Sequence, residues 1–218
     1  MNRRDFLKGA GAAAIVPAAI PGAIWGPSLS LLREPEGAAK SVAPESVAPR
    51  QVTPISAVVY DERYADCRLF AAALVSQGAV AFPANADSAQ LWYGSLRAHL
   101  ARRPGRVAGL TTYADFTVSQ ACGRELNLAT LYEGAHDARR SRSNLTHRLR
   151  VSGDAPDIAA AIARPDASWA ESLANALCRF PSARDSAVRH ASTVPTPRAG
   201  GHPGYLASWL LAPPATVL

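Results

Sequence analysis

The sequence lacks the motifs by which common enzyme classes are recognised. It has no Gly-x-Ser-x-Gly turn, no His-Glu-x-x-His zinc helix and no phosphate loop ending in Gly-Lys-Ser or Gly-Lys-Thr. Its three cysteines, Cys67, Cys122 and Cys178, form no Cys-x-x-Cys pair, and all fall on the predicted apolar faces of helices. We expect buried, unreactive thiols. The residues identify no enzyme family, no metal site and no cofactor.

The first 26 residues have the layout of an export signal. A charged start is followed by an apolar run rich in Ala and Gly, from Gly9 to Trp25, and by small residues. The run Arg-Arg-Asp-Phe-Leu-Lys resembles the twin-arginine translocation signal, with Asn2 where Ser or Thr is commoner. On this resemblance the signal residues are Arg3, Arg4, Phe6, Leu7 and Lys8.

The composition of this segment bears on two other interpretations. The glycines and prolines make it a poor buried helix, although an uncleaved membrane anchor stays open because no clean Ala-x-Ala site follows the apolar run. Residues 9–14 fit Gly-x-Gly-x-x-Ala, but a dinucleotide site needs a strand before it, and none is predicted there. The twin-arginine resemblance implies cargo that folds before export, with a cofactor, with a partner, or simply quickly.

Lysine is scarce, since only Lys8 and Lys40 occur, and arginine therefore carries most of the formal net charge of +6. The densest basic cluster is residues 138–150. Charge alone would allow nucleic-acid binding, but an exported protein rarely meets nucleic acid, so none is expected. An anionic ligand, a lipid head group or an acidic partner fits this cluster better, and a solvated hairpin fits it best.

The remaining chain divides into a tether and one domain. Residues 27–54 repeat Val-Ala-Pro and contain few large apolar side chains, which is typical of an extended linker. Residues 55–218 follow, in a chain whose residues are 48% hydrophobic and 18% charged. This length and composition predict a single globular domain with one core.

Within the domain, short apolar runs alternate with helical patterns. Strands are expected at 56–61, 79–84, 106–113 and 128–134, with helices between them that Asp87 and Asp115 can cap. This order predicts an α/β fold with a mostly parallel, three-layer αβα sheet. The polar alternation of residues 144–152 indicates an antiparallel edge hairpin, and residues 204–213 a final strand.

Ligands of an open parallel sheet bind beyond the carboxyl ends of its strands. This rule selects polar residues after each of the four strands, and Glu133, His136 and Asp137 form the most site-like group. Helix capping and surface ion pairs are the alternative roles. The candidate acid–base residues are Asp61, Asp115, Glu133 and His136, and the candidate cofactor-binding residues are Thr111 and Thr112; the other strand-end residues are Glu62, Arg63, Asn85, Asp87 and Tyr113.

Three hypotheses for function follow. The first is a periplasmic binding or accessory protein that takes a small polar ligand or a co-exported protein partner. The second is an enzyme with an acid–base or metal site at the strand ends. The third is a structural protein anchored in the membrane by an uncleaved signal. In all three the twin-arginine export machinery is a partner.

Overall fold

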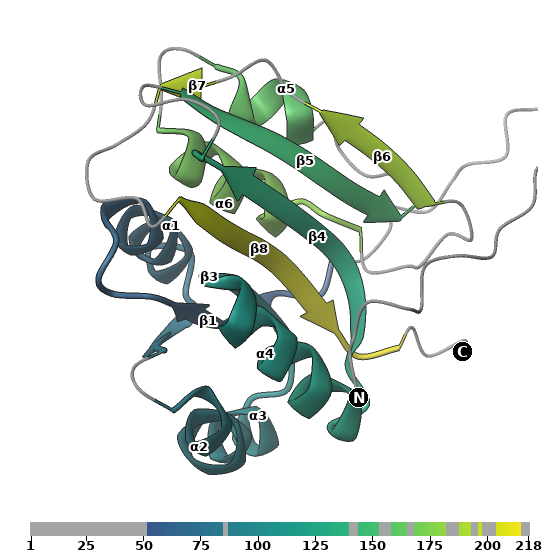
Figure 1. Ribbon diagram of the computed structural model, residues 1–218. Helices are drawn as coiled ribbons and strands as arrows, with labels where there is room; N and C mark the ends of the chain where they lie inside the picture. Colours follow the sequence, from purple (N-terminus) through teal and green to yellow (C-terminus); the bar gives the residue numbers. More distant parts are fainter. Residues whose placement is uncertain are drawn as a thin grey trace, which may run out of the picture. The chain divides into compact units, whose positions relative to one another are not determined.

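The computed structural model describes residues 52–84, 87–139, 144–152, 158–164, 168–181, 188–192, 196–197 and 204–214. These residues form a mixed sheet with helices packed against it (Figure 1). The predicted signal and nearly all of the predicted linker lie outside the described residues. Among the helices that the structure describes, none has the length and apolarity needed to cross a membrane.

The elements alternate along the chain much as the hydrophobic pattern predicts. The strands are β1 (Ile55–Tyr60), β2 (Val80–Pro83), β3 (Arg106–Thr111), β4 (Ala129–Asp137), β5 (Asn144–Ser152), β6 (Val188–Ser192), β7 (Thr196–Pro197) and β8 (Tyr205–Ala212). The helices are α1 (Ala65–Val75), α2 (Ser88–Leu91), the π-helical turn η1 (Trp92–Leu96), α3 (Arg97–Arg102), α4 (Tyr113–Glu125), α5 (Ile158–Ile162) and α6 (Trp169–Cys178).

The α/β class is correct, but the prediction of a mostly parallel sheet is wrong. The strand order is β2-β1-β3-β8-β4-β5-β6, with the short β7 pairing β5. Among the described strands, only the β1–β2 and β1–β3 pairs are parallel, while β8 pairs antiparallel with both β3 and β4, and β5 with both β4 and β6. The predicted edge hairpin is likewise not at the edge, because β6 extends the sheet beyond β5.

Strand direction matters more than pairing for the position of a site. Because β3 and β4 are each antiparallel to β8, which lies between them, β4 runs in the same direction as β3. The carboxyl ends of β1, β2, β3 and β4 therefore lie along one edge of the sheet, as an all-parallel arrangement would also have placed them.

Two apolar clusters pack on opposite faces of the sheet, as the alternation of β1 illustrates. Val58 belongs to the cluster under α1, α5 and α6, whereas Ala57 and Val59 belong to the cluster under η1 and α4. On the face of the second cluster, α4 contacts β3, β8 and β4. No described helix covers β5 on that face, where Arg148 and Arg150 are exposed. The three-layer part of the prediction is therefore not confirmed.

The helix starts show which capping expectations hold. The Asp87 carboxylate accepts a hydrogen bond from the Gln90 backbone N–H at 3.0 Å and so caps α2 as predicted. Helix α4, however, is capped by Thr112, whose Oγ1 accepts from the Asp115 backbone N–H at 3.3 Å. The expectation that Asp115 is the cap is wrong by three residues, because the chain already turns into the helix at the end of β3.

The centre of the second cluster is the indole of Trp209 on β8. This side chain is fully buried, stacks with Phe116 at a centroid distance of 6.4 Å and lies 6.3 Å from the ring of Trp92. Its Nε1 donates a hydrogen bond to Thr111 Oγ1 at 3.3 Å. The ring lies directly over Gly109 of β3, where the missing side chain leaves the space that the indole fills.

Arg106, the first residue of β3, is a fully buried cation. Its guanidinium donates to the carbonyl oxygens of Phe180 at 2.6 Å and Cys178 at 3.0 Å, just where α6 ends. A positive charge is favourable there because it satisfies the last carbonyls and complements the helix dipole. Burial opposes this gain and lowers the pKa of Arg106 to about 10.

Replacing Arg106 with methionine is expected to lower the free energy of unfolding by about 2 kcal/mol. Methionine fills much of the same volume, but it leaves the carbonyls of Phe180 and Cys178 without these donors. Urea denaturation at unchanged slope would measure the loss. R106K, which keeps the charge but not the fork of donors, should lie between R106M and wild type. An R106M protein as stable as wild type would mean that desolvation of the guanidinium offsets its hydrogen bonds completely.

Candidate functional site

The structure brings most of the predicted site residues to one edge of the sheet. Asp61 directly follows β1, Thr111 ends β3, and His136 is the penultimate residue of β4. Glu133 lies farther back in β4, away from this edge. Asn85 is outside the described residues. The strand-end rule thus places these residues correctly in space, and the hydrogen bonds they make decide what they can do.

Asp61 is fully buried and holds the exposed Arg63 in a fixed position. Its Oδ1 accepts from the Arg63 backbone N–H at 3.1 Å and from Nε at 2.9 Å, while Oδ2 accepts from Nη2 at 2.6 Å. The Arg63 side chain is 65% exposed, whereas that of Asp61 is 0% exposed. The carboxylate is therefore the anchor of a paired guanidinium, a different arrangement from an acid–base group that faces a substrate.

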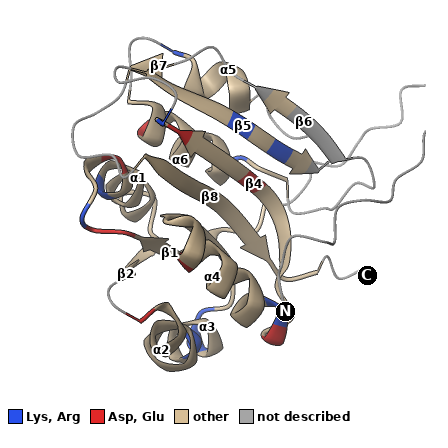
Figure 2. Ribbon diagram, viewed as in Figure 1, with Lys and Arg blue, Asp and Glu red and all other residues tan. Residues whose placement is uncertain are grey.

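The same arrangement occurs at the end of β4. Asp137 Oδ1 accepts from the Arg139 backbone N–H and from Nε, both at 2.9 Å, and Oδ2 accepts from Nη2 at 2.9 Å. Arg148 Nη2 approaches the same carboxylate at 4.0 Å. Figure 2 shows the acidic and basic positions that follow β1 and β4 along one edge. The ion pair of Asp61 with Arg63 confirms the alternative role expected for these two residues, whereas its repeat in Asp137 and Arg139 was not predicted.

Asp115 and the two threonines bind one another and Ser88. The Asp115 carboxylate accepts from Ser88 Oγ at 2.5 Å and from Thr112 Oγ1 at 2.6 Å. Thr111 Oγ1 donates to the Thr112 carbonyl at 3.1 Å. These contacts tie the start of α2 to the start of α4. The roles predicted for Asp115 in catalysis and for Thr111 and Thr112 in cofactor binding stay predictions.

His136 belongs to a buried chain of polar side chains from four strands. Its Nε2 lies 2.7 Å from Ser208 Oγ, and its Nδ1 lies 2.7 Å from Nδ1 of His147. Ser208 Oγ lies 2.9 Å from the Tyr132 hydroxyl, and His147 Nε2 lies 2.7 Å from Thr196 Oγ1. Both imidazoles pack against Trp169, at centroid distances of 4.5 and 5.0 Å.

The geometry of this chain suits a structural link better than a reactive centre. Two Nδ1 atoms can share a hydrogen bond only if one carries the proton and the other accepts it, so the tautomers of His136 and His147 are coupled. Burial raises the pKa of Tyr132, which keeps the phenol neutral. His136, His147 and Ser208 are all 0% exposed, so a substrate would not reach them. Periodicity did not reveal these two partners: His147 lies opposite His136 in the register of β4 and β5, and the contact with Ser208 depends on the position of β8 beside β4.

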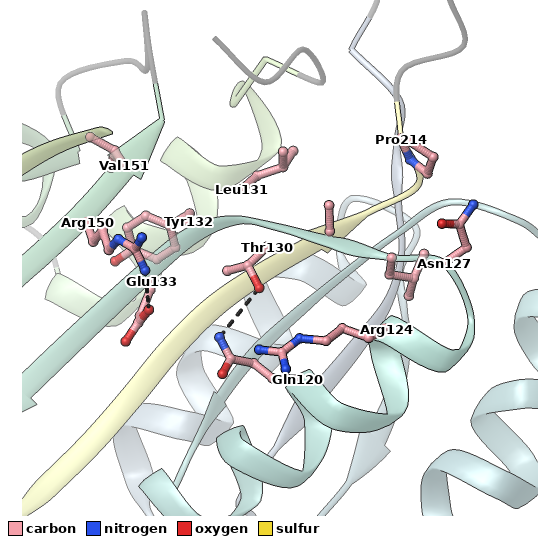
Figure 3. A pocket seen from close by; sticks show the side chains of 12 residues that line it. Gln120, Arg124, Asn127, Thr130, Leu131, Tyr132, Glu133, Arg150, Val151 and Pro214 are labelled. Carbon is pink, nitrogen blue, oxygen red and sulfur yellow. Dashed lines mark hydrogen bonds and ion pairs between the residues drawn. The ribbon is translucent and has the colours of Figure 1, made fainter. Parts of the chain in front are cut away.

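The structure has a polar pocket near the opposite end of β4, between this strand, β5 and the last turns of α4 (Figure 3). It is a hollow of about 370 Å³. Within it Arg150 Nη1 lies 3.6 Å from Glu133 Oε2, and Gln120 Nε2 donates to Thr130 Oγ1 at 3.5 Å. Its lining residues are Gln120, Arg124, Asn127, Leu128, Ala129, Thr130, Leu131, Tyr132, Glu133, Arg150, Val151 and Pro214.

This pocket has the polar groups expected of a site for a small anion. Arg124 and Arg150 bring two positive charges and Glu133 one negative charge, which leaves an excess of one positive charge in the lining. Gln120, Asn127 and Thr130 add amides and a hydroxyl, which can bind hydroxyl groups of a ligand. Of the candidate residues from the sequence, only Glu133 lines it.

The described residues provide no group of three or more His, Cys, Asp or Glu side chains that could hold a metal ion. The cysteines are free thiols, buried at Cys67 and Cys122 and half-buried at Cys178. Burial raises the pKa of each thiol, which disfavours the reactive thiolate.

Comparison with known proteins identifies the first residues of the chain. Residues 1–19 match the family described as the TAT (twin-arginine translocation) pathway signal sequence, a range that contains the signal residues predicted from Arg3 to Lys8. No curated protein and no solved structure matches the chain. The protein is thus exported across the membrane and is handled by the twin-arginine machinery, and the family match does not extend to the globular domain.

Proposed function

Starting from its export signal, we propose that this protein acts in the periplasm as a binding protein for a small anionic ligand, which it holds in the polar pocket. The observation that carries the proposal is the collection of two guanidiniums, two amides and a hydroxyl around one solvent-accessible hollow. Its volume of about 370 Å³ is in the range of small-molecule sites.

The ligand class follows from the charges. Arg124 is in the last turn of α4, and Arg150 is held next to Glu133 on the neighbouring strand. A ligand carboxylate can bind the Arg124 guanidinium through two hydrogen bonds, and ligand hydroxyls can donate to Glu133 and bind Gln120 and Thr130. These groups together favour a small hydroxylated carboxylate, such as a sugar acid, over a neutral sugar or a cation.

The same geometry favours binding over acid–base catalysis. Asp61 and Asp115 are each engaged by hydrogen-bond donors of the protein, and His136 is buried. A general acid or base must reach the atom whose proton it transfers, directly or through one water molecule. The hydrogen bonds and the burial of these three residues favour a structural role for each of them. Glu133 is the one remaining candidate residue, and it faces the pocket.

The first test is titration calorimetry of the mature protein with glucuronate and, as a neutral analogue, glucose. We expect glucuronate to bind and glucose to bind at least about tenfold more weakly. Replacing Arg124 with glutamine should weaken glucuronate binding by about tenfold or more, because a hydrogen bond to a charged group contributes about 1.5–3 kcal/mol.

R102Q is the matched control, since Arg102 is an exposed residue of α3 that does not line the pocket. It should bind glucuronate as wild type does. Equal affinity for glucuronate and glucose, an equal loss in R102Q and R124Q, or no binding of glucuronate, galacturonate or gluconate at millimolar concentration would each contradict the proposal.

A further inference from the structure

The edge at which β1 and β4 end presents two arginines held in the same way. In each case a buried aspartate at the strand end accepts the backbone N–H and the Nε–Nη2 side of the arginine two residues later. The side chains of Arg63 and Arg139 are nevertheless 65% and 64% exposed. The ion pair uses one side of each guanidinium, and the Nη1 side is not part of it.

Two tyrosines lie between these arginines. Tyr113, at the start of α4, is 56% exposed, and its ring meets that of Tyr205 edge to face at 5.9 Å. The Arg139 guanidinium lies 5.0 Å from the centre of the Tyr205 ring. Tyr113 stands just after the end of β3 and Tyr205 begins β8, so the two rings lie at the ends of the two strands that separate β1 from β4.

The spacing of this surface can be derived from the strand order. From β1 to β4 there are three steps, through β3 and β8. At about 4.8 Å per step, the ends of β1 and β4, which Arg63 and Arg139 follow, are about 14 Å apart. That distance is too long for one small carboxylate to bridge. It is close to the separation of residues four apart in an extended peptide, about 13 Å, whose side chains point to the same face.

Arginine and tyrosine are the residues that most often dominate protein–protein interfaces. An arginine that the protein already holds by an ion pair loses little conformational freedom when it binds a second acceptor. The surface formed by Arg63, Tyr113, Tyr205 and Arg139, called here the arginine–tyrosine edge, therefore combines charge, exposed rings and fixed geometry.

We propose that the arginine–tyrosine edge is the docking surface for a protein partner, which binds through an extended acidic segment. The segment places two acidic side chains, four residues apart, on Arg63 and Arg139, and the apolar or aromatic side chain midway between them on Tyr113 and Tyr205. The inference is independent of the polar pocket, which lies away from this edge.

The test uses two labelled peptides of identical composition and measures binding by fluorescence polarisation. Gly-Glu-Ser-Phe-Ser-Glu-Gly has its acidic residues four apart with Phe midway on the same face. Gly-Glu-Phe-Ser-Glu-Ser-Gly has them three apart, on opposite faces of an extended chain. The first peptide is expected to bind at least about fivefold more tightly to the mature protein, and its affinity should fall with added salt.

Variants then locate the binding. Replacing Arg63 alone would leave the buried Asp61 carboxylate without its main partner, so the paired change Asp61→Asn with Arg63→Gln removes both charges and retains an acceptor for the backbone. This pair, and separately Tyr113→Ala, should each weaken the first peptide by about fivefold or more. R102Q and R124Q are the controls that should leave it unchanged, and the paired variant should still bind glucuronate as wild type does.

Equal binding of the two peptides, no binding of either at millimolar concentration, or binding that Tyr113→Ala and the paired change both leave intact would overturn the inference. Polygalacturonate that binds more tightly than the first peptide, and whose binding the same variants abolish, would assign the edge to an anionic polysaccharide instead of a protein. Loss of glucuronate binding in R124Q with retained peptide binding would separate the two sites.

Discussion

Replacing Arg3 and Arg4 together with lysine is expected to abolish export, so that the full-length precursor accumulates in the cytoplasm. The change keeps both positive charges but removes the planar guanidiniums, which bind acceptors through two parallel hydrogen bonds as an ammonium cannot. Residues 1–19 match the twin-arginine signal, and this pair of arginines is the feature from which that signal takes its name. Cell fractionation followed by immunoblotting measures the distribution of the protein.

Arg33 provides the control, since R33K makes the same chemical change outside the matched range. Normal export of the R33K protein together with blocked export of the double variant would assign the effect to the signal. If the double variant were exported as wild type is, the chain would not depend on its arginine pair, and the expectation that it is exported folded would fail.

Replacing Gly109 with alanine is expected to lower the free energy of unfolding by about 3 kcal/mol. A Cβ atom at this position would overlap Cε2 and Cζ2 of Trp209. The indole is fully buried between Phe116 and Trp92, so it has little room to move aside. Denaturation by urea, monitored by tryptophan fluorescence and by far-UV circular dichroism, measures the loss.

A double-mutant cycle tests the cause. Trp209→Leu alone should be destabilising, by about 3 kcal/mol or more, because it empties part of the core. In the Trp209→Leu background, however, Gly109→Ala should cost less than about 1 kcal/mol, since the overlapping ring is gone and alanine is favoured over glycine in a strand. Strictly additive losses would mean that the contact between the two positions does not explain the effect.

How far the fold could be predicted is illustrated by β4 and β8. The hydrophobic runs identified both as strands, because runs of this kind report burial. Their neighbours could not be predicted, since pairing depends on which strands meet in space. One signal was available, however. Leu206 and Leu210 face one apolar cluster while Ala207, Trp209 and Leu211 face the other, so the run Tyr-Leu-Ala-Ser-Trp-Leu-Leu-Ala is buried on both sides and belongs inside the sheet.

For the candidate site, the sequence predicted positions better than roles. The strand-end rule brought Asp61, Thr111 and His136 to one edge, as the direction of β1, β3 and β4 shows. The rule uses only the position of a residue at a strand end and takes no account of the side chains with which that residue pairs. Arg63 is only two residues from Asp61 and pairs with it, whereas the partners of His136 are His147, 11 residues away on β5, and Ser208, 72 residues away on β8. The polar pocket was not predicted, because it lies near the opposite end of β4 from the residues that the rule selects; of the candidates, only Glu133 lines it.

The central place of β8 has a consequence for how the protein is made. It is the last strand of the described chain, yet β3 and β4 are joined only through it. During synthesis, the segments that include β1 to β6 therefore leave the ribosome with a gap in the middle of their sheet, and long-range pairing of this kind is slow. The sheet closes only when residues 205–212 insert between strands made about 70 residues or more earlier. A pathway that transports folded proteins would then carry only chains whose translation has passed this strand, so the topology links export to the completion of synthesis.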